Sequence, residues 1–379
     1  MDFDFSEEQK ALKDEARRFL SAVAPITVAR GVLDDPQRGH DAALWQRIVE
    51  QGWCGAAIPE TYGGLGLGHV ELCALAEELG RAVAPVPFAS SVYAFAEALL
   101  LAGTEAQKQA LLPGVASGEV VGTLAVSEGP GPLAVGRLAA RVLDGRLTGM
   151  KIPVIDGEVA THCVVLAAGD GGPGLYLADL SAGGVSRELV STVDPTRGAA
   201  RVSFADVPVE PLGAPGAGFA LLDAVQDRAA VLLAFEAVGG ADRALEMARD
   251  YALERYAFGR PIGGYQAIKH KLADVFIKNE VARANAYYAA WALSANAPEL
   301  PLAAAAARVA ATNAYWLASK ENIQTHGGIG FTWEADCHFF YRRAKHLALA
   351  LGGLPEWKRR LVDRVEAKAL ADDAERNAA

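Results

Sequence analysis

The stretch YALERYAFGRPIGGYQ, residues 251–266, decides the fold of the chain. A long helical pattern runs into it, glycines and a proline then break the chain, and a second helical pattern starts near Gln266. Arg255, Phe258 and Gln266 therefore meet at one corner between two helices. A guanidinium is a planar fork suited to a diphosphate, an aromatic ring can cover another apolar ring, and an amide can read the edge of a heterocycle. A helix corner with a capping arginine is the alternative interpretation.

This corner resembles the signature of the acyl-CoA dehydrogenases, flavoenzymes that desaturate acyl-CoA thioesters. Three more stretches are similar to the same family and occur in family order over nearly the whole chain: FSEEQ at 5–9, PETYGGLGL at 59–67 and QTHGGIGF at 324–331. Together the matches are more specific than any one of them. The resemblance implies FAD as the cofactor, bound mainly by a neighbouring subunit. The residues that it places at FAD are Arg255, Phe258, Gln266, Gln324, Thr325, His326, Gly327 and Gly328.

Length and composition bound the class of protein. At 379 residues the chain is too long for one ordinary core, so two or three domains are expected. A hydrophobic content of 51% supplies ample apolar surface to bury. The net charge of −10 argues against a nucleic-acid partner and gives no support for binding to anionic membranes.

The cysteines Cys54, Cys73, Cys163 and Cys337 are scattered and form no Cys-x-x-Cys pair. Their spacing predicts neither a disulfide framework nor a zinc site, and we expect no metal. It is typical of a reducing cytoplasm, and the acidic start MDFD shows no secretory signal. The alanine-rich run 302–311 is too short to span a bilayer and is interpreted as a buried helix.

The pattern of residue types along the sequence changes near residue 120 and again near residue 215. Helical periodicity dominates both ends, while short runs of Val, Ile, Leu and Thr between Gly, Asp and Pro fill the middle. This order predicts a mainly α protein with a β domain, and it matches the acyl-CoA dehydrogenase architecture. The expected parts are an N-terminal all-helical domain (1–119), a middle β-barrel or sandwich domain (120–213) and a C-terminal helical bundle domain (214–379).

In the first region, Ser6 and Gln9 form a capping box that opens a helix to about Val23. Further helices are expected at 42–51, 71–83, 92–102 and 106–115. The glycine-rich loop at 61–68 lacks the Lys-Ser/Thr that follows in a phosphate-binding loop, so we interpret it as a turn-rich connection.

The middle region reads as a small antiparallel barrel or sandwich, with Asp144-Gly145 as a hairpin turn. Strands are expected at 121–126, 139–143, 146–152, 163–168 and 175–179. After Pro215 the pattern predicts a bundle of long helices. These cover 219–254, 266–293, 300–324 and 335–351, followed by a charged terminal helix from Glu356.

The resemblance implies a glutamate that removes the α-proton of the acyl-CoA while a β-hydride passes to flavin N5. Such a base must lie within hydrogen-bond reach of the proton. The family places it at one of two positions. Alignment on the tract before Gly352 puts Leu351 at the first, and counting back from Gly239 puts Ala229 at the second. Ala230 takes the position of the neighbouring arginine, so both glutamate positions are occupied by apolar residues.

Three nearby acids are candidate substitutes for the missing base. Asp227 lies about 200° around the helix from Ala229. Glu236 shares the face of Ala229 but lies roughly 10 Å along the helix axis. Glu334 more simply complements the start of the following helix. Asp227 and Arg228 together are also interpreted as a charged helix surface or as a contact to the polar end of coenzyme A.

The middle region departs from the family pattern. The flavin loop, usually Thr-Glu-Pro-x-x-Gly-Ser, reads SEGPGPL at 127–133. Ser127 keeps a hydroxyl for the flavin, whereas Leu133 replaces the later serine. The Trp-Ile-Thr strand that flanks the isoalloxazine in the family falls on residues 153–155, which read PVI. The indole and the threonine hydroxyl are therefore absent, while the helical stretches that reach a partner's FAD are intact.

His326 stands where the family often has an apolar residue. With Trp333, Asp336 and His338 it resembles a subgroup common among actinobacterial dehydrogenases. That subgroup includes subunits of mixed tetramers that degrade steroids, in which one type of chain can carry the base for both. A packing role for His326 is the alternative.

The sequence favours an FAD-dependent acyl-CoA dehydrogenase or the base-lacking partner subunit of one. The expected assembly is a homodimer, a homotetramer or a heterotetramer with a homologous subunit, with an acyl-CoA as substrate. A homomeric enzyme with a displaced base, Asp227 or Glu236, is the second hypothesis. A non-catalytic structural or binding protein that keeps the fold is the third.

Overall fold

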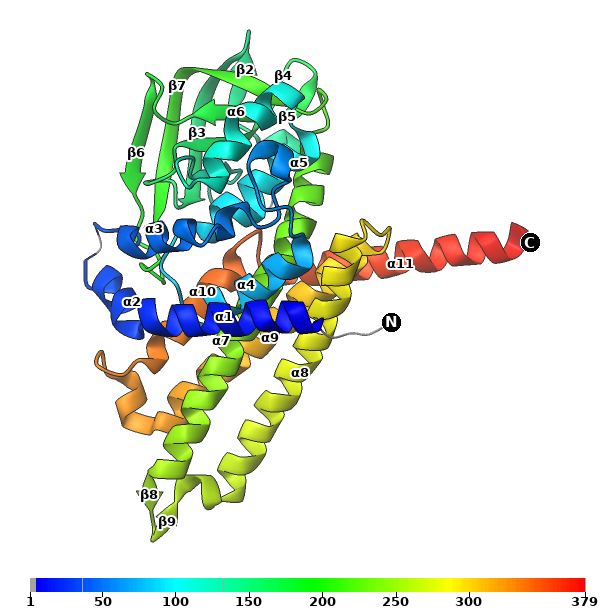
Figure 1. The fold of residues 1–379 in the computed structure, drawn as a ribbon. Helices are drawn as coiled ribbons and strands as arrows, with labels where there is room; N and C mark the ends of the chain where they lie inside the picture. Colours follow the sequence, from blue (N-terminus) through cyan, green and yellow to red (C-terminus); the bar gives the residue numbers. More distant parts are fainter. Residues whose placement is uncertain (1–4, 36, 132, 379) are drawn as a thin grey trace. The chain divides into compact units, whose positions relative to one another are not determined.

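Helices occupy both ends of the chain and strands its middle (Figure 1). The computed structural model describes residues 5–35, 37–131 and 133–378. The acidic start at residues 1–4 and Pro132 of the flavin-loop match lie outside these residues. The first helices are α1 (Glu7–Val23), α2 (Ile26–Leu33), α3 (Ala42–Glu50), α4 (His69–Arg81), the π-helical η3 (Ala89–Ala96), α5 (Glu97–Ala102) and α6 (Glu105–Ala116).

The middle strands are β1 (Gly122–Ala125), β2 (Arg141–Leu143), β3 (Arg146–Ile155), β4 (His162–Gly169), β5 (Gly172–Asp179), β6 (Val185–Leu189) and β7 (Ala199–Leu212). The remaining elements are α7 (Gly218–Glu254), β8 (Tyr256–Ala257), β9 (Arg260–Pro261), α8 (Gln266–Ser294), α9 (Leu300–His326), the 3-10 turn η6 (Gly327–Phe331), α10 (Cys337–Leu349) and α11 (Leu354–Ala378).

Internal contacts divide the chain into two units, each made of segments distant in sequence. The helical unit comprises the residues up to 22, residues 73–84 and the chain from residue 230 onward. The mixed unit comprises residues 23–72 and 85–229. Helices α4 and α7 contribute to both units. The three-domain division remains a prediction.

Local signals define the first helices. Gln9 N–H donates to Ser6 Oγ at 3.2 Å and Ser6 N–H donates to Gln9 Oε1 at 2.9 Å, which confirms the capping box. Helix α2 is not indicated by the sequence pattern, because β-branched residues disfavour its first turn. Burial of Val32 and Leu33 stabilises it instead.

The strands of the mixed unit form a closed barrel. β4, β2, β3, β7 and β5 pair in that order, and β5 pairs back with β4. The expectation of a purely antiparallel sheet is wrong, since β1 and one end of β2 run parallel to β4. The β2–β3 hairpin reverses the chain once, and the connection from β3 to β4 reverses it again. β4 therefore runs in the direction of β2, and β1 runs in that direction too. Asp144 and Gly145 have φ of 49° and 71°, which confirms the two-residue hairpin turn.

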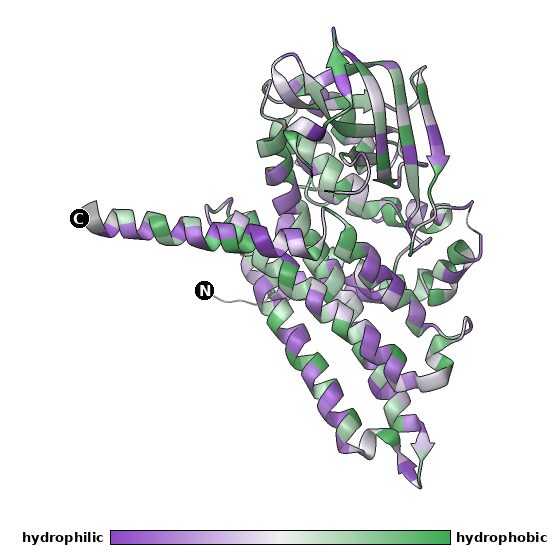
Figure 2. Cartoon of the chain, turned by 180° about the vertical axis from the view of Figure 1, so that it is seen from behind, coloured by the Kyte–Doolittle hydropathy of each residue, from purple (hydrophilic) through white to green (hydrophobic). Residues whose placement is uncertain are grey.

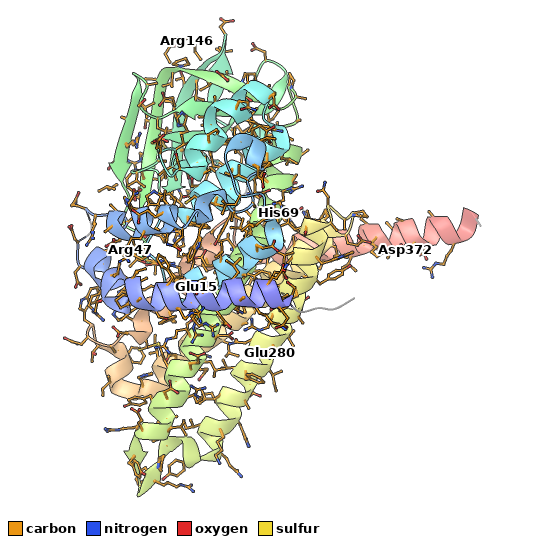
Figure 3. All side chains as sticks on the ribbon, in the orientation of Figure 1. Glu15, Arg47, His69, Arg146, Glu280 and Asp372 are labelled. Carbon is orange, nitrogen blue, oxygen red and sulfur yellow. The ribbon has the colours of Figure 1, made fainter. Side chains whose placement is uncertain are left out.

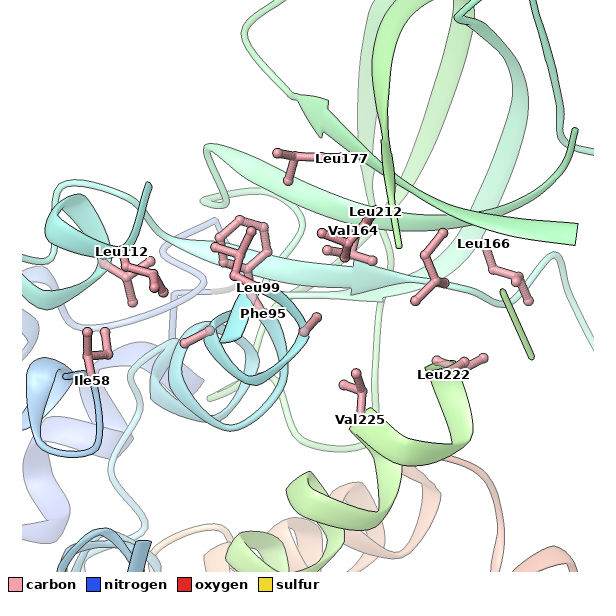
Figure 4. Close-up of a cluster of buried hydrophobic side chains, with 14 of the residues drawn as sticks. Ile58, Phe95, Leu99, Leu112, Val164, Leu166, Leu177, Leu212, Leu222 and Val225 are labelled. Atoms are coloured by element: carbon pink, nitrogen blue, oxygen red, sulfur yellow. The ribbon is translucent and has the colours of Figure 1, made fainter. Parts of the chain in front are cut away.

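A hydrophobic core holds the barrel against helices of the same unit (Figure 4). Phe95 of η3 and Leu99 of α5 belong to one cluster with Leu166 of β4. Leu222 and Val225 from the start of α7 complete it. Each fully buried side chain of this kind contributes about 1.5–3 kcal/mol, so apolar burial fixes the first turns of α7 within this unit.

The glycine-rich loop at 61–68 is held by backbone hydrogen bonds to the residues just before it. Leu65 N–H donates to Gly55 O and Leu67 N–H donates to Ala56 O, each at 2.8 Å. A Cβ on Gly64 would lie 2.0 Å from the oxygen of the Ile58 carbonyl, so this position requires glycine. These backbone donors are used inside the loop, as expected for a turn-rich connection.

In the helical unit, α4 and α7 cross with their backbones in contact. A Cβ on Gly80 would lie 1.9 Å from Glu236 O, and a Cβ on Gly239 would lie 1.8 Å from Glu77 O. Because each distance is far inside van der Waals contact, both positions require glycine.

The buried carboxylates beside this crossing are paired. Glu77 accepts from Lys13 Nζ at 2.7 Å and from Arg283 Nη1 at 2.5 Å, and Glu78 accepts from Arg17 Nη2 at 2.8 Å. Burial by itself would raise the pKa of Glu77, but the two cations lower it below its ordinary value. The ionised form of Glu77 is therefore stable inside the unit.

The alanine-rich run 302–311 lies inside α9, and its Arg308 is only 1% exposed, which confirms a buried helix. Among the described residues, no helix is both long and apolar enough to cross a membrane. The four cysteines are buried. No group of three or more His, Cys, Asp or Glu is arranged to hold a metal within the described part of the chain.

Two acids with buried carboxylate oxygens, Asp156 and Glu158, follow strand β3 in the mixed unit. Asp156 Oδ2 accepts from Ser90 Oγ at 2.6 Å and from Arg197 Nη2 at 3.4 Å. Both carboxylate oxygens of Glu158 are buried without a partner side chain among the described residues. Burial, and then the negative charge of Asp156, raise the pKa of Glu158 to about 7, and Arg197 and Arg187 offset only part of this.

We expect the free energy of unfolding to fall as the pH rises from about 4.5 to about 7, by up to about 3 kcal/mol from Glu158 alone. The folded chain keeps a proton on Glu158 that the unfolded chain releases in this range. Glu158→Gln should remove this part of the slope, measured by urea unfolding at a series of pH values. Glu188→Gln, at an exposed carboxylate of β6, is the control and should leave the slope unchanged. An unaltered slope in Glu158→Gln would contradict the raised pKa.

Candidate functional site

The predicted helix corner lies at the end of α7. α7 ends at Glu254, as expected, and Arg255 follows as the capping residue, with its N–H donating to Tyr251 O at 2.8 Å. The β8–β9 hairpin then leads to Gln266, which begins α8 as expected. Phe258 at the hairpin tip has φ of 52° and is 97% exposed. The corner thus presents a cation, an amide and an aromatic ring at the surface of the helical unit.

The second predicted flavin segment lies at the end of α9. Gln324 is exposed, whereas Thr325 is buried and its hydroxyl donates to Glu321 O at 2.7 Å. His326 Nδ1 is 2.8 Å from Asn322 O, and the imidazole stacks on Tyr251 with ring centroids 4.3 Å apart. Since Tyr251 lies one turn before Arg255, the fold brings the α7 and α9 segments together. His326 therefore has the packing contact of the alternative interpretation, and it remains a predicted cofactor residue.

The glycines after α9 leave open space. A Cβ on Gly327 or on Gly328 would meet nothing within 4 Å among the described residues, and Gly327 has φ of 65°. Ile329 and Phe331 follow in η6 and are 52% and 80% exposed. This surface combines accessible backbone with exposed apolar side chains.

These features fit a cofactor that has a diphosphate and a flat ring system. Arg255 and Gln266 are exposed and supply a guanidinium and a carboxamide. Phe258 supplies an aromatic face that no other described residue covers. All three lie in the helical unit, on the element that the resemblance assigns to the FAD of a neighbouring subunit.

The barrel residues that are predicted to contact FAD fit this cofactor less well. Ser127 Oγ accepts from Gly129 N–H at 3.3 Å and donates to Gly129 O at 3.2 Å, so the hydroxyl is engaged in its own turn. The neighbouring Glu128 accepts from Lys151 Nζ at 2.7 Å. Burial alone would raise the pKa of Glu128, but Lys151 and two backbone N–H groups lower it. Val154 of β3 takes the place of the isoleucine in the Trp-Ile-Thr motif, and its side chain is fully buried in the core.

The first glutamate position lies in a small apolar cluster of the helical unit. Leu351 packs there with Ala305, Trp357 and Ala230, which takes the place of the arginine beside the second glutamate position. Leu351 has φ of 59°, and Trp357 Nε1–H donates to Leu351 O at 3.0 Å. Ala229 is also buried, at 1% exposure. None of these side chains can take a proton.

One buried cation anchors the tract before Leu351. Arg308 of α9 donates from Nη2 to the carbonyls of Leu347 and Ala350, the latter at 2.7 Å. Cations suit the carbonyl end of a helix, here α10. Burial lowers the pKa of Arg308 to about 10. Its Nε and Nη1 have no hydrogen-bond partner among the described residues, so the guanidinium is incompletely satisfied.

The candidate substitute bases differ in their surroundings. Glu236 is 2% exposed and lies 3.4 Å from Arg343 Nη1, a buried ion pair that favours a structural role. Asp227 is 4% exposed on α7. The structure places Asp227 next to Arg228, as the sequence requires, and the two side chains diverge around the helix.

A polar cluster that the sequence did not indicate engages Arg228 within the mixed unit. Arg228 Nη1 lies 3.4 Å from Glu97 Oε2, and His69 Nε2 lies 2.7 Å from Glu97 Oε1. His69, labelled in Figure 3, begins α4 directly after the glycine-rich loop. Glu97 sits 28 residues farther along the chain, so no local pattern links the two. Arg308 was likewise visible only as an interruption in an alanine-rich run.

Comparison with known proteins agrees with this architecture. The model for the acyl-CoA dehydrogenase N-terminal domain matches residues 6–119, and the model for the C-terminal domain matches residues 216–365. Acyl-CoA dehydrogenase IpdE2 of Mycobacterium tuberculosis is 35% identical over 361 residues, which cover 95% of this chain and 98% of the relative.

Solved structures of the same fold include two that are each named for a pair of proteins. The Tcur3481-Tcur3483 steroid ACAD is 33% identical with a TM-score of 0.87, and the match covers 96% of this chain and 99% of that one. A chain of the ChsE4-ChsE5 complex from Mycobacterium tuberculosis is 27% identical with a TM-score of 0.87, covering 97% and 99%. The chain therefore belongs to the acyl-CoA dehydrogenase family of FAD-dependent oxidoreductases, which act on CH–CH groups.

Proposed function

We propose that this chain is the base-lacking subunit of a heteromeric acyl-CoA dehydrogenase. A homologous partner chain supplies the carboxylate that removes the α-proton of the acyl-CoA. The observation that carries the proposal is that apolar side chains occupy both positions of the family's glutamate: Leu351 packs in a small apolar cluster with Trp357, and Ala229 is buried on α7. A glutamate restored in place of Leu351 would lie in a unit that already contains the incompletely satisfied guanidinium of Arg308.

The chain keeps the residues expected to hold the cofactor. FAD, when bound, supplies the hydride acceptor of this chemistry. Arg255 pairs with a diphosphate, Gln266 and Gln324 offer amides, and Phe258 covers a ring. The open backbone at Gly327 and Gly328 allows close approach. On the barrel side Ser127 offers one hydroxyl, and Asp227 with Arg228 is the proposed contact to coenzyme A.

The substrate is proposed to be a steroid-derived acyl-CoA. The solved steroid ACAD supports this, since it matches the chain over nearly its whole length. The named pairs among the solved structures support a partner of the same fold. The four reduced cysteines fit a cytoplasmic location.

A homomeric dehydrogenase with a displaced base is the second candidate function. Asp227 favours it, because this carboxylate is buried on α7 two residues from Ala229. Glu236 supports it less, because Arg343 pairs with that carboxylate. A non-catalytic protein of the same fold is the third, and the exposed flavin-site residues of the helical unit argue against it.

Arg255→Ala should release FAD from the purified protein, because the diphosphate would lose a bidentate cationic partner. We expect the flavin absorbance per chain to fall at least several-fold at equal protein concentration. Arg249→Ala is the matched control: it removes an exposed arginine one turn and a half earlier on α7, and should leave the flavin content unchanged. Equal flavin in both variants would contradict the assignment of Arg255.

The chain should be oligomeric at micromolar concentration. Phe258 is 97% exposed, and α11 extends away from the other helices of its unit with Val362, Val365 and Leu370 exposed (Figures 1 and 2). Such surface is normally covered by a partner. Light scattering should give a dimer or tetramer, either of this chain or with a co-purifying homologous chain. A monomer that retains FAD would rule out a cofactor site completed by two subunits.

The chain alone should desaturate acyl-CoA very slowly, because a positioned base contributes about 10²–10⁴-fold. Adding a homologous subunit that carries the glutamate should restore turnover of the complex. Leu351→Glu should raise the rate of the isolated holoprotein, and Leu351→Gln, equal in shape but not basic, should not.

The measurement is anaerobic flavin bleaching by acyl-CoA. Turnover of about 1 s⁻¹ or more by the unmodified chain alone, which is within the ordinary enzyme range, would show that this chain carries its own base. Asp227→Asn would then be the first variant to test.

A further inference from the structure

Gln226 carries a buried carboxamide whose oxygen has no donor among the described residues. It lies on α7 in the mixed unit and is 3% exposed. Its Oε1 has no hydrogen-bond partner among the described residues. Leaving a buried acceptor unpaired is unfavourable, so such an atom in a folded protein calls for an explanation.

The position of Gln226 on its helix relates it to the proposed site. Residues three and four apart share a face of an α-helix, so Gln226 lies on the same face as Ala229, about 4.5 Å away along the axis. Leu222 lies one turn earlier on this face and belongs to the apolar core of the mixed unit (Figure 4). A polar oxygen is thus set into an otherwise apolar face, one turn from a position assigned to the catalytic base.

Two other polar side chains of the mixed unit, Arg228 and Gln107, have the protein partners that the oxygen of Gln226 does not have among the described residues. Arg228 projects about 200° around the helix from Gln226 and is engaged by Glu97. Gln107, a second buried glutamine of the mixed unit, is fully used: it caps α6 and donates to Glu210 and to Pro211 O. The buried carboxamide of Gln226 therefore differs from one that serves only to hold the structure.

We propose that Gln226 determines substrate specificity by accepting a hydrogen bond from a hydroxyl group on the acyl part of the CoA thioester. This inference rests on the proposed function, because it takes the face around Ala229 as the one that meets the acyl group. A carboxamide oxygen can pair only with a donor. An ammonium group would be disfavoured beside the apolar core at Leu222 and Val225, whereas a neutral hydroxyl requires little desolvation.

The physical consequence is discrimination against plain acyl chains. A site built to bond a substrate hydroxyl rejects the analogue that lacks it, because the buried protein group is then left unpaired. The substrate class is accordingly a hydroxylated acyl-CoA with a bulky apolar body. The hydroxyl does not react, so it changes the affinity of the ligand and leaves the desaturation chemistry untouched.

The test measures binding, so that it does not depend on which chain supplies the base. The probes are CoA thioesters in which sulfur replaces the β-carbon, which removes the β-hydride and prevents desaturation. One series carries a hydroxyl at successive carbons of the chain, a second carries a ketone at the same carbons, and a third carries neither. Titration calorimetry with the FAD-loaded protein or its complex gives the dissociation constants.

We expect at least one hydroxylated thioester to bind about tenfold or more tightly than its unsubstituted counterpart, as one well-formed hydrogen bond allows. Gln226→Leu should abolish this ratio while leaving the unsubstituted thioester bound as tightly as before or more tightly. Gln107→Leu, the same change at a bonded glutamine, should retain the ratio. Gln226→Met, which keeps an unbranched side chain of similar length, provides the same test if the leucine variant does not fold.

Three outcomes would overturn the inference. An equal effect of Gln226→Leu on both kinds of thioester would assign the residue a structural role. No effect on either would mean that an ordered water satisfies the oxygen. A preference for the ketone series would show that the amide nitrogen faces the ligand. Failure of the parent protein to bind any acyl thioester would instead refute the proposed function, and is distinguishable because all probes would fail together.

Discussion

Two helix backbones touch where α4 crosses α7, and the rest of the helical unit depends on that contact. Neither Gly80 nor Gly239 could carry even a methyl group, because each faces a carbonyl oxygen of the other helix. A crossing this close leaves little freedom to slide or rotate. It fixes the register of α7, the element along which the site residues are spaced.

The contact is stable because the charges around it are compensated. Two adjacent carboxylates on α4, Glu77 and Glu78, are almost fully buried, and each has a cation within hydrogen-bond distance. Arg283 of α8 joins Glu77 to Asp242 of α7, so one guanidinium links three helices. Removing a single partner from such a group would leave an uncompensated charge in a low-dielectric interior, which is strongly destabilising.

Helix α7 sets the spacing between the residues of the proposed chemistry. From its start it carries Leu222 in the apolar core, Gln226, the Asp227–Arg228 pair and Ala229 at the second base position, and it ends at Glu254, directly before Arg255 of the predicted flavin corner. The C-terminal end of the helix leads into the family's expected cofactor-binding residues. At the positions of the glutamate and its arginine the helix carries Ala229 and Ala230 instead. This division of the family's functions along one helix is what a subunit would show if a partner performed the deprotonation.

The sequence alone determined the fold class, and it predicted the flavin corner and the apolar residues at the two base positions. Each of these follows from residues close together in the chain: a capping box at Ser6, a hairpin turn at Asp144, and a glycine and proline break before Gln266. It missed α2, where burial outweighs weak helix propensity, and it misjudged the strand directions, which depend on how hairpins return. Only the tertiary structure joined Tyr251 to His326, Leu351 to Ala230 and Glu97 to His69, because these contacts form between segments whose spacing in sequence carries no signal. It alone also revealed that Gln226 is buried and that its oxygen has no partner among the described residues, since burial and hydrogen bonding depend on the packed neighbours and not on the residue itself.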